Sequence, residues 1–299
     1  MAIFYYSDFK TEFKSSNFGD DVNPYLMNRL FSPELINSEK VCVVGVGTLI
    51  NDKNISKLQS YSKKVVFSSG VGYGNLPESF DNSWDFVCVR GPNSSSRLGL
   101  SNDKAICDGA ILLSDFYPVI NKSDRKIERV FIPHLKTHWA VGQVLKKIVN
   151  RVGFFYLTPD VPAEVFIEKV SDAKVVVTEA MHGAILADTM RVPWIPVSIH
   201  EHLRFKWEDW FFSLGLEYET HSIAPLIWNP PRKAFKRAIK LPYQFYKEHL
   251  FEARLRRIMA SSQPILSPDS ILKSKKSSLY DCVEYINEKY GRGILYNDK

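Results

Sequence analysis

The 299-residue chain lacks the features that stabilise small exported domains. Its only four cysteines have no CxxC or other metal-ligand spacing: Cys42, Cys88, Cys107 and Cys282. Three of them lie within apolar runs, where a free cysteine usually serves as a small buried side chain. This usage indicates a reducing compartment and excludes a disulfide scaffold. A chain of this length buries enough apolar surface to fold without such links.

Signals for membrane insertion and export are also missing. No uninterrupted apolar stretch approaches the roughly 18 residues that a spanning helix requires. The first eight residues have neither a basic region nor an apolar core, so no secretory leader is indicated. With 45% hydrophobic and 24% charged residues and no internal repeat, the composition is that of a folded protein, which we expect in the cytoplasm.

The charge is distributed unevenly along the chain. The formal net charge is +6, but residues 231–260 contain nine basic and two acidic residues and carry +7, so the remainder sums to −1. A basic patch confined to one segment argues against a nucleic-acid partner. Apolar residues recur there at helical spacing, which predicts a basic amphipathic helix on an anionic membrane surface. The alternative is a helix packed on its own domain, and Pro242 predicts an interruption in either case.

Short apolar, β-rich runs fill the first 200 residues. The predicted strands are 2–6, 41–46, 64–68, 85–90, 105–107, 129–132, 152–157, 174–178 and 194–198. Such continuous runs are typical of parallel strands that helices cover on both faces.

A polar stretch at 116–128 predicts a domain boundary. The sequence thus predicts an α/β fold with two Rossmann-like, doubly wound domains that face a cleft. We expect an N-terminal acceptor-side domain at 1–125 and a C-terminal donor-side domain at 126–225. A basic amphipathic helical tail at 226–299 would follow them.

Asn17-Phe18-Gly19-Asp20 lies between the first predicted strand and the first predicted helix. Amide groups at a helix start attract anions. The side chains of Asn17 and Asp20 are suited to hydrogen bonds with a sugar or a phosphate ester. The alternative is an ordinary helix cap with a turn glycine.

A second motif, Glu179-Ala180-Met181-His182-Gly183, follows the buried strand at 174–178. The helix that begins here favours a phosphate or carboxylate at its start. His182 suits a general acid that protonates a departing phosphate, because the pKa of imidazole lies near neutrality. Glu179 is a candidate to orient this imidazole or to deprotonate an attacking hydroxyl. The alternative is a helix cap with a satisfied histidine.

Further cationic candidates follow other predicted strands. His134, Lys136 and His138 lie within five residues and are suited to clamp an anion or a sugar, although a solvated loop is the alternative. The His-x-x-x-His spacing also suits a metal on a helix, but no HExxH-type partner accompanies it, and we predict no metal.

Arg90 ends a predicted strand and is a candidate for bidentate anion binding. The serines at 94–96 that follow are expected to cap the next helix. Arg204 and Lys206 come after the last predicted strand of the second domain, where they are placed to reach the cleft.

Together the Asn-x-Gly-Asp motif, Arg90–Ser94, Glu179–Ala184 and Arg191–Trp194 resemble the polysaccharide pyruvyltransferase family, most of all its succinoglycan-type ketal pyruvyltransferases. The resemblance covers most of the first two predicted domains. It implies a GT-B-like fold, phosphoenolpyruvate as the donor substrate without a cofactor, and a saccharide acceptor. The product would be a pyruvate ketal that bridges two sugar hydroxyls, with release of phosphate. His182 would be the acid and donor-binding histidine, with Asn17 and Asp20 lining the cleft.

The chain departs from the family at Ala180, where many members carry an arginine two residues before the histidine. Other cations must then meet the donor's charge, and the candidates are Arg90, His134, Lys136, Arg204 and Lys206. We expect a metal-independent enzyme that acts on a lipid-linked saccharide at the inner face of the cytoplasmic membrane, in surface or exopolysaccharide synthesis. The alternatives are a GT-B-fold glycosyltransferase with a nucleotide-sugar donor and a non-catalytic assembly protein.

Overall fold

The computed structural model describes residues 3–6, 17–199, 203–223 and 234–291, with side chains in the last range described from Tyr243 onward. Its strands are β1 (Ile3–Phe4), β2 (Val41–Val44), β3 (Gly47–Ile50), β4 (Lys63–Val71), β5 (Trp84–Val89), β6 (Val130–Ile132), β7 (Phe155–Tyr156), β8 (Val176–Thr178), β9 (Trp194–Ser198) and β10 (His221–Ser222). The α-helices are α1 (Phe18–Leu30), α2 (Pro33–Ile36), α3 (Asp52–Ile55), α4 (Pro92–Arg97), α5 (Leu135–Arg151), α6 (Ala163–Ser171), α7 (Met181–Thr189), α8 (Arg204–Ser213), α9 (Ala234–Ser261) and α10 (Asp269–Tyr290). The short 3₁₀ helices are η1 (Ser56–Leu58), η2 (Asn102–Lys104), η3 (Gly109–Asp115) and η4 (Lys122–Asp124).

The first sheet contains β1 to β5, and every pairing in it is parallel. β4 is its centre: β2 pairs with its first residues, β3 with its last, and β5 with its other edge. Val41–Val44 and almost all of β4 are buried, as the continuous apolar runs predict. The turn after β2 and the end of β4 therefore lie at the same end of the sheet.

The second sheet contains the other five strands in the order β10-β9-β8-β6-β7, again all parallel. The predicted α/β class with parallel sheets is therefore confirmed. The predicted boundary at 125 falls between the two sheets, since β5 ends at Val89 and β6 begins at Val130. The strand predicted at 105–107 is wrong, because only a single bridge joins Val89 and Ala105.

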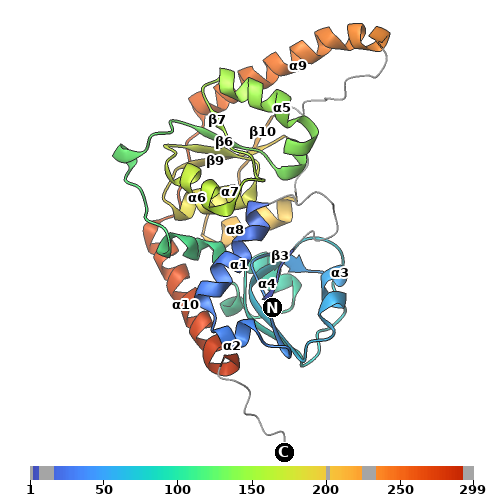
Figure 1. Cartoon of the computed structure of the whole chain (residues 1–299), viewed down its shortest axis with the longest axis vertical. Coiled ribbons are helices and arrows are strands. Elements are labelled where there is room, and N and C mark those ends of the chain that lie inside the picture. The colour runs from blue at the N-terminus through green and yellow to red at the C-terminus, as the bar shows by residue number, and fades with distance from the viewer. Residues whose placement is uncertain (1–2, 7–16, 200–202, 224–233, 292–299) are drawn as a thin grey trace, which may run out of the picture.

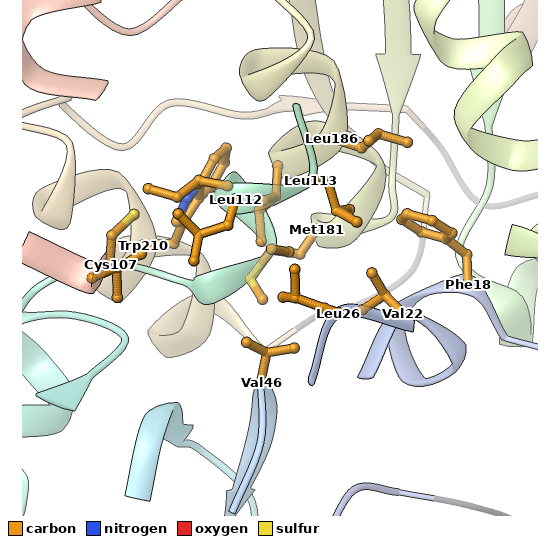
Figure 2. Close-up of a cluster of buried hydrophobic side chains, with 14 of the residues drawn as sticks. Phe18, Val22, Leu26, Val46, Cys107, Leu112, Leu113, Met181, Leu186 and Trp210 are labelled. Atoms are coloured by element: carbon orange, nitrogen blue, oxygen red, sulfur yellow. The ribbon is translucent and has the colours of Figure 1, made fainter. Parts of the chain in front are cut away.

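Apolar side chains fill much of the space between the two sheets (Figure 2). α1 and α7 contribute Phe18, Leu26 and Met181, and the Phe18 ring stacks on Phe166 of α6 at 4.2 Å. η3, which links the two sheets, adds Leu112 and neighbouring residues. One continuous apolar cluster therefore joins both sheets, and a polar site between them has to lie beside it.

The two C-terminal helices pack on different sheets (Figure 1). Phe251, Leu255 and Ile258 of α9 are buried in the core of the second sheet, where Phe251 meets Phe131. α10 returns to the first sheet and buries Leu279 and its neighbours there. The C-terminal part of the basic segment is thus a packed helix, as the alternative interpretation predicted for this segment.

The interruption that Pro242 predicts is absent, because α9 runs as one 28-residue helix from Ala234 to Ser261. A proline removes one hydrogen bond from a helix, which packing of the remaining turns can offset. Among the described residues, no helix combines the length and the apolar character that crossing a bilayer demands.

Candidate functional site

The starts of α1 and α7 meet beside the apolar cluster. Gly19 lies in the first turn of α1, and His182 lies in the first turn of α7. A Cβ atom on Gly19 would stand 2.2 Å from Nδ1 of the His182 imidazole, closer than any real Cβ contact. Only glycine permits this approach. The fold thus brings together two motifs that lie about 160 residues apart in the sequence.

His182 is a half-buried residue whose ring lies in an electropositive environment. Its Nε2 atom is fully buried and has no hydrogen-bond partner among the residues that the structure describes. Burial, reinforced by the charges of Lys206 and Arg90, lowers the pKa of His182 to about 3. The imidazole is therefore neutral near pH 7 in the free protein. A buried nitrogen without a partner costs free energy, which marks Nε2 as a candidate ligand contact.

Lys206, near the start of α8, is the principal cation beside this histidine. Burial lowers the pKa of Lys206 to about 8, the charges of Arg90 and Lys136 act in the same direction, and Asp20 opposes them. These groups must lie close to one another to shift the pKa of one amine. The Nζ atom of Lys206 also lies 5.9 Å from the centroid of the Tyr73 ring.

Asn17 and Asp20 join the first motif to this cluster. Asn17 occupies the N-cap position of α1, but its side chain makes no capping hydrogen bond. Its amide Nδ2 instead donates to Oδ2 of Asp20 at 2.5 Å. Asn17 is thus the N-cap that the alternative interpretation predicted, although its side chain makes no capping bond, and both polar groups lie at the helix start, next to Gly19.

Arg90 is fully buried and connects the end of β5 to α8. Its Nε atom pairs with Oδ2 of Asp209 at 3.0 Å, and its terminal nitrogens donate to Oγ1 of Thr48 and the carbonyl of Val71. The other Asp209 oxygen accepts the amide of Ser94 at 2.9 Å and so caps α4. This network favours a structural role for Arg90, whose charge still acts on His182 and Lys206.

Glu179 is buried, and its two oxygens hold backbone amides. Oε2 accepts the amide of His134 at 3.0 Å, and Oε1 accepts that of Ile199 at 3.1 Å. His134 in turn caps α5, because its Nδ1 accepts the amide of Lys136 at 3.2 Å. Glu179 and His134 thus fix the loops that follow three neighbouring strands, which places Lys136 at the start of α5.

For three predicted site residues the structure shows contacts outside the cluster or a packing role. His138 contacts the hydroxyl of Tyr156 at 2.9 Å and Asp160 at 3.5 Å. Arg204 is exposed and pairs with Glu208 at 2.6 Å. Gly183 is buried, and a Cβ atom there would lie 2.7 Å from Oγ1 of Thr178, so packing requires this glycine.

Sequence reasoning missed three residues of this region. Two of them, Asp209 and Tyr73, were not among the predicted site residues. Asp108 is buried in front of η3, where Oδ1 accepts the amide of Ala110 and Oδ2 has no partner in the described part of the chain. Burial raises the pKa of Asp108 to about 6, although the charge of Arg90 opposes this. The only signal for Asp108 in the sequence was the glycine that follows it.

No group of three or more His, Cys, Asp or Glu side chains that is suited to a metal ion occurs within the described ranges. The cluster has the composition of a candidate anion site, with a neutral histidine, two lysines and a carboxylate near helix starts. Fold and site together define an α/β protein with two parallel sheets and a candidate oxyanion site where they meet.

Residues 3–201 match the family model of the polysaccharide pyruvyl transferases, and the chain belongs to this family. The resemblance inferred from the motifs is thereby confirmed. The chain is also 36% identical over 214 residues to the succinoglycan biosynthesis protein ExoV of Rhizobium meliloti (strain 1021). That match covers 71% of this chain and 66% of ExoV, so it spans slightly less than two thirds of that relative.

Proposed function

We propose that this protein transfers the pyruvyl group of phosphoenolpyruvate to a saccharide, as a ketal, in the synthesis of a bacterial surface polysaccharide or exopolysaccharide. Its family and its similarity to a succinoglycan biosynthesis protein support this activity. The observation that carries the proposal is the buried Nε2 of His182, which has no partner among the described residues, beside the amine of Lys206. In this proposal the two sheets form GT-B-like domains, with the donor on the second.

Phosphoenolpyruvate carries a phosphate and a carboxylate, and the site has to meet both charges. Of the candidate lysines and arginines, Lys206 and Lys136 have no ion pair within the described ranges, and the buried Arg90 adds the field of its charge. The starts of α1 and α7 supply backbone amides and favourable dipoles. These groups take the place of the arginine that Ala180 replaces. Arg204 and His138, which have other partners, have no direct role in this proposal.

The donor itself supplies the charge that His182 needs to act as an acid. In the free protein Lys206 and Arg90 help to hold the pKa of His182 at about 3. A bound phosphate offsets these positive charges and raises the pKa, because a nearby anion favours the imidazolium form. Once the first acceptor hydroxyl has added to the enol carbon, the protonated Nε2 donates to the phosphate oxygen as its bond to that carbon breaks.

Two acceptor hydroxyls add to that same carbon in turn. As the first adds, the methylene carbon of the donor takes up a proton and becomes the methyl group. The second then takes the place of the phosphate and closes the ketal, so the two protons that the hydroxyls lose balance those gained by the methyl group and the phosphate. Asp20 is placed to take the proton from the attacking hydroxyl, since it lies at the start of α1 near Lys206. Asn17, which donates to Asp20, fixes the orientation of this carboxylate. Glu179 serves as a positioning residue through its two backbone hydrogen bonds.

We further propose that the acceptor is lipid-linked and that the enzyme works peripherally at the inner face of the cytoplasmic membrane. The exposed aromatic side chains Tyr243, Phe245 and Tyr246 on α9 support this location, together with the +7 charge of segment 231–260. Aromatic rings and basic residues on one helix suit an anionic interface.

The direct test is incubation with phosphoenolpyruvate and saccharide acceptors isolated from a polysaccharide-producing bacterium. We expect phosphate release that depends on the acceptor, with a product heavier by one pyruvyl group. His182→Ala should reduce kcat by about 10² to 10⁴, the usual contribution of a general acid. Binding of a nucleotide sugar without turnover of phosphoenolpyruvate would favour a glycosyltransferase. Neither activity, in a folded protein, would favour an assembly role.

A further inference from the structure

A cavity of about 740 Å³ lies between the edge of the second sheet and the last turns of α9. One wall is formed by the edge strand β10 and the two residues before it, and the other by the end of α9 and the segment that follows this helix. That segment reaches the start of β9, because Ile265 forms a bridge with Trp194. None of the residues that line the cavity belongs to the candidate oxyanion site, which follows the opposite ends of the strands.

Two arginines of α9 line this cavity. Arg254 and Arg257 are three residues apart, which places their side chains next to each other on one face of the helix, and both are exposed. Neither forms an ion pair with another described residue, whereas Arg256 pairs with Glu252 at 3.0 Å and does not line the cavity. Two guanidinium groups thus border one space without a counter-ion in the described part of the chain.

The other polar groups of the cavity suit a ligand that carries both phosphate and hydroxyl groups. The hydroxyls of Ser261 and Ser262 lie at the end of α9, one turn after the arginines, and are able to donate to an anion. On the opposite wall, Glu219 is the single acidic side chain in the lining that the structure describes. Its carboxylate and the amide oxygen of Gln263 are acceptors for hydroxyl groups. The two arginines therefore outnumber the acidic side chain, and the excess charge is positive.

The size of the cavity exceeds what a bare phosphate fills. Its volume lies within the range of about 300–1,000 Å³ that is usual for small-molecule sites, so a phosphate would share it with an organic group. The planar fork of a guanidinium matches two oxygens of a phosphate, and arginine is the side chain that most often recognises this group.

We propose that this cavity binds the phosphate ester of a polyol or sugar. The phosphate pairs with Arg254 and Arg257, and the hydroxyls of the ester face Glu219 and Gln263 on the other wall. This chemistry is shared by a soluble sugar or polyol phosphate and by the headgroup of an anionic phospholipid. The inference does not depend on the transfer of a pyruvyl group, because it concerns residues outside the candidate active site.

The end of α9 gives the two arginines an alternative role. The last carbonyl groups of a helix carry partial negative charge, which nearby cations offset. An arginine that acts only in this way stabilises the helix and binds no ligand. The experiment therefore has to measure ligand affinity and stability separately.

The test is calorimetric titration of the full-length protein with glycerol 3-phosphate. We expect saturable binding by the wild type and a loss of affinity of about tenfold or more in the double variant Arg254→Gln, Arg257→Gln. Arg256→Gln is the matched control, because it removes the same charge from the same turn of the helix but lies outside the cavity, and it should change the affinity little. Lys206→Ala separates this site from the candidate oxyanion site, since it should retain the binding that the double variant loses.

Sedimentation with vesicles distinguishes the two sources of the ligand. If the phosphate belongs to a phospholipid headgroup, the double variant should sediment less than Arg256→Gln with vesicles that contain phosphatidylglycerol. If it belongs to a soluble ester, the two variants should sediment alike, although only the double variant loses its affinity for glycerol 3-phosphate.

The proposal is overturned if millimolar glycerol 3-phosphate does not bind to the wild type, or if the double variant binds it as well as the wild type does. An equal loss of affinity in Arg256→Gln would also contradict it, because the attraction would then come from the general charge of α9. A lower Tm of the double variant with unchanged affinity would assign the arginines to the helix end alone.

Discussion

At the scale of single residues, Gly19 sets the distance between the two helix starts. Gly19→Ala would place a methyl group 2.2 Å from Nδ1 of His182 and displace the ring. We expect a loss of about 1–3 kcal/mol in the free energy of unfolding, as for other overpacked sites, and at least a tenfold loss of kcat. Urea denaturation and the phosphate-release assay measure these two effects.

A double-mutant cycle provides the control for Gly19. In a His182→Ala background the obstructing ring is gone, so Gly19→Ala should no longer destabilise the protein. It should even stabilise by up to about 1 kcal/mol, because alanine is the better helix former. If Gly19→Ala costs as much in this background as in the wild type, the contact with His182 is not the cause.

The pKa of Lys206 leads to a prediction of how donor binding depends on pH. The amine is charged below its pKa of about 8 and neutral above it, so binding of the anionic donor should weaken as the pH rises through 8. We expect the fall of kcat/KM for phosphoenolpyruvate with pH to steepen by about a further tenfold for each pH unit above that value, since this ratio reports the free enzyme.

Lys206→Arg tests this assignment, because arginine keeps its charge to a pH above about 12. The alkaline fall in kcat/KM should then move to a higher pH. Arg204→Ala is the matched control on the same helix, where the side chain is exposed and paired with Glu208, and it should leave the profile unchanged. An identical profile in Lys206→Arg would refute the role of Lys206.

Individual residues also show which parts of the candidate site can be predicted from the sequence. The helix starts at Asn17–Asp20 and at His182 were predictable, because each follows an apolar strand and has a glycine in its first turn. The structural roles of Glu179 and Arg90 were not predictable. Glu179 accepts the amide of Ile199, Arg90 pairs with Asp209, and neither partner is close in the sequence. A carboxylate that holds two amides looks the same in sequence as a catalytic one.

At the scale of elements, the Arg90–Asp209 pair joins α8 to the end of β5 and to α4. Asp209→Ala leaves the Arg90 guanidinium buried without its counter-ion. It also removes the carboxylate oxygen that accepts the amide of Ser94 at the start of α4. Breaking a buried pair on one side costs about 3–5 kcal/mol, because the remaining charge stays desolvated. We therefore expect a large fall in the midpoint of urea denaturation.

A surface pair supplies the comparison for this prediction. Lys174 and Glu128 also form an ion pair, but both side chains are exposed, so Glu128→Ala should cost less than about 1 kcal/mol. Equal costs for Asp209→Ala and Glu128→Ala would show that burial of the Arg90 pair contributes nothing.

Some strands could be predicted from the sequence and others could not. The apolar runs at 41–46 and 194–198 correspond to β2 and β9, since buried parallel strands have a clear pattern. β3 and β10 were missed, because Gly47–Ile50 follows a glycine turn and His221–Ser222 is a polar pair at a sheet edge. Short edge strands are defined by their neighbours more than by their own residues.

At the scale of the whole molecule, the C-terminal helices determine which experiments are sound. Removing the chain from residue 231 onward would delete Phe251 and Leu255 from the second core and Leu279 from the first. Such a truncation would unfold the protein and could not report on membrane binding. A test has to alter surface side chains of α9 and leave its packed face intact.

The exposed turns of α9 offer that test. Tyr243 and Tyr246 are 51% and 61% exposed, and the amine of Lys247 lies 5.4 Å from the centroid of the Tyr243 ring. Aromatic rings that enter the interface add to the attraction of basic residues, which contribute about 1 kcal/mol each near an anionic surface. We expect the triple variant Tyr243→Ser, Phe245→Ser, Tyr246→Ser to sediment less with vesicles that contain phosphatidylglycerol, while its Tm stays unchanged.

Phe212→Ser is the matched control for the triple variant, because Phe212 is 44% exposed on α8, where two basic and two acidic residues balance. This variant should bind vesicles as the wild type does, and binding by all forms should weaken in 0.5 M salt, where exposed charges are screened. If the triple variant sediments like the wild type, the rings of α9 do not enter the interface. Binding that is lost in salt would then come from the basic residues alone, and binding that is absent in every form would leave α9 as a helix whose only role is to pack on the second sheet.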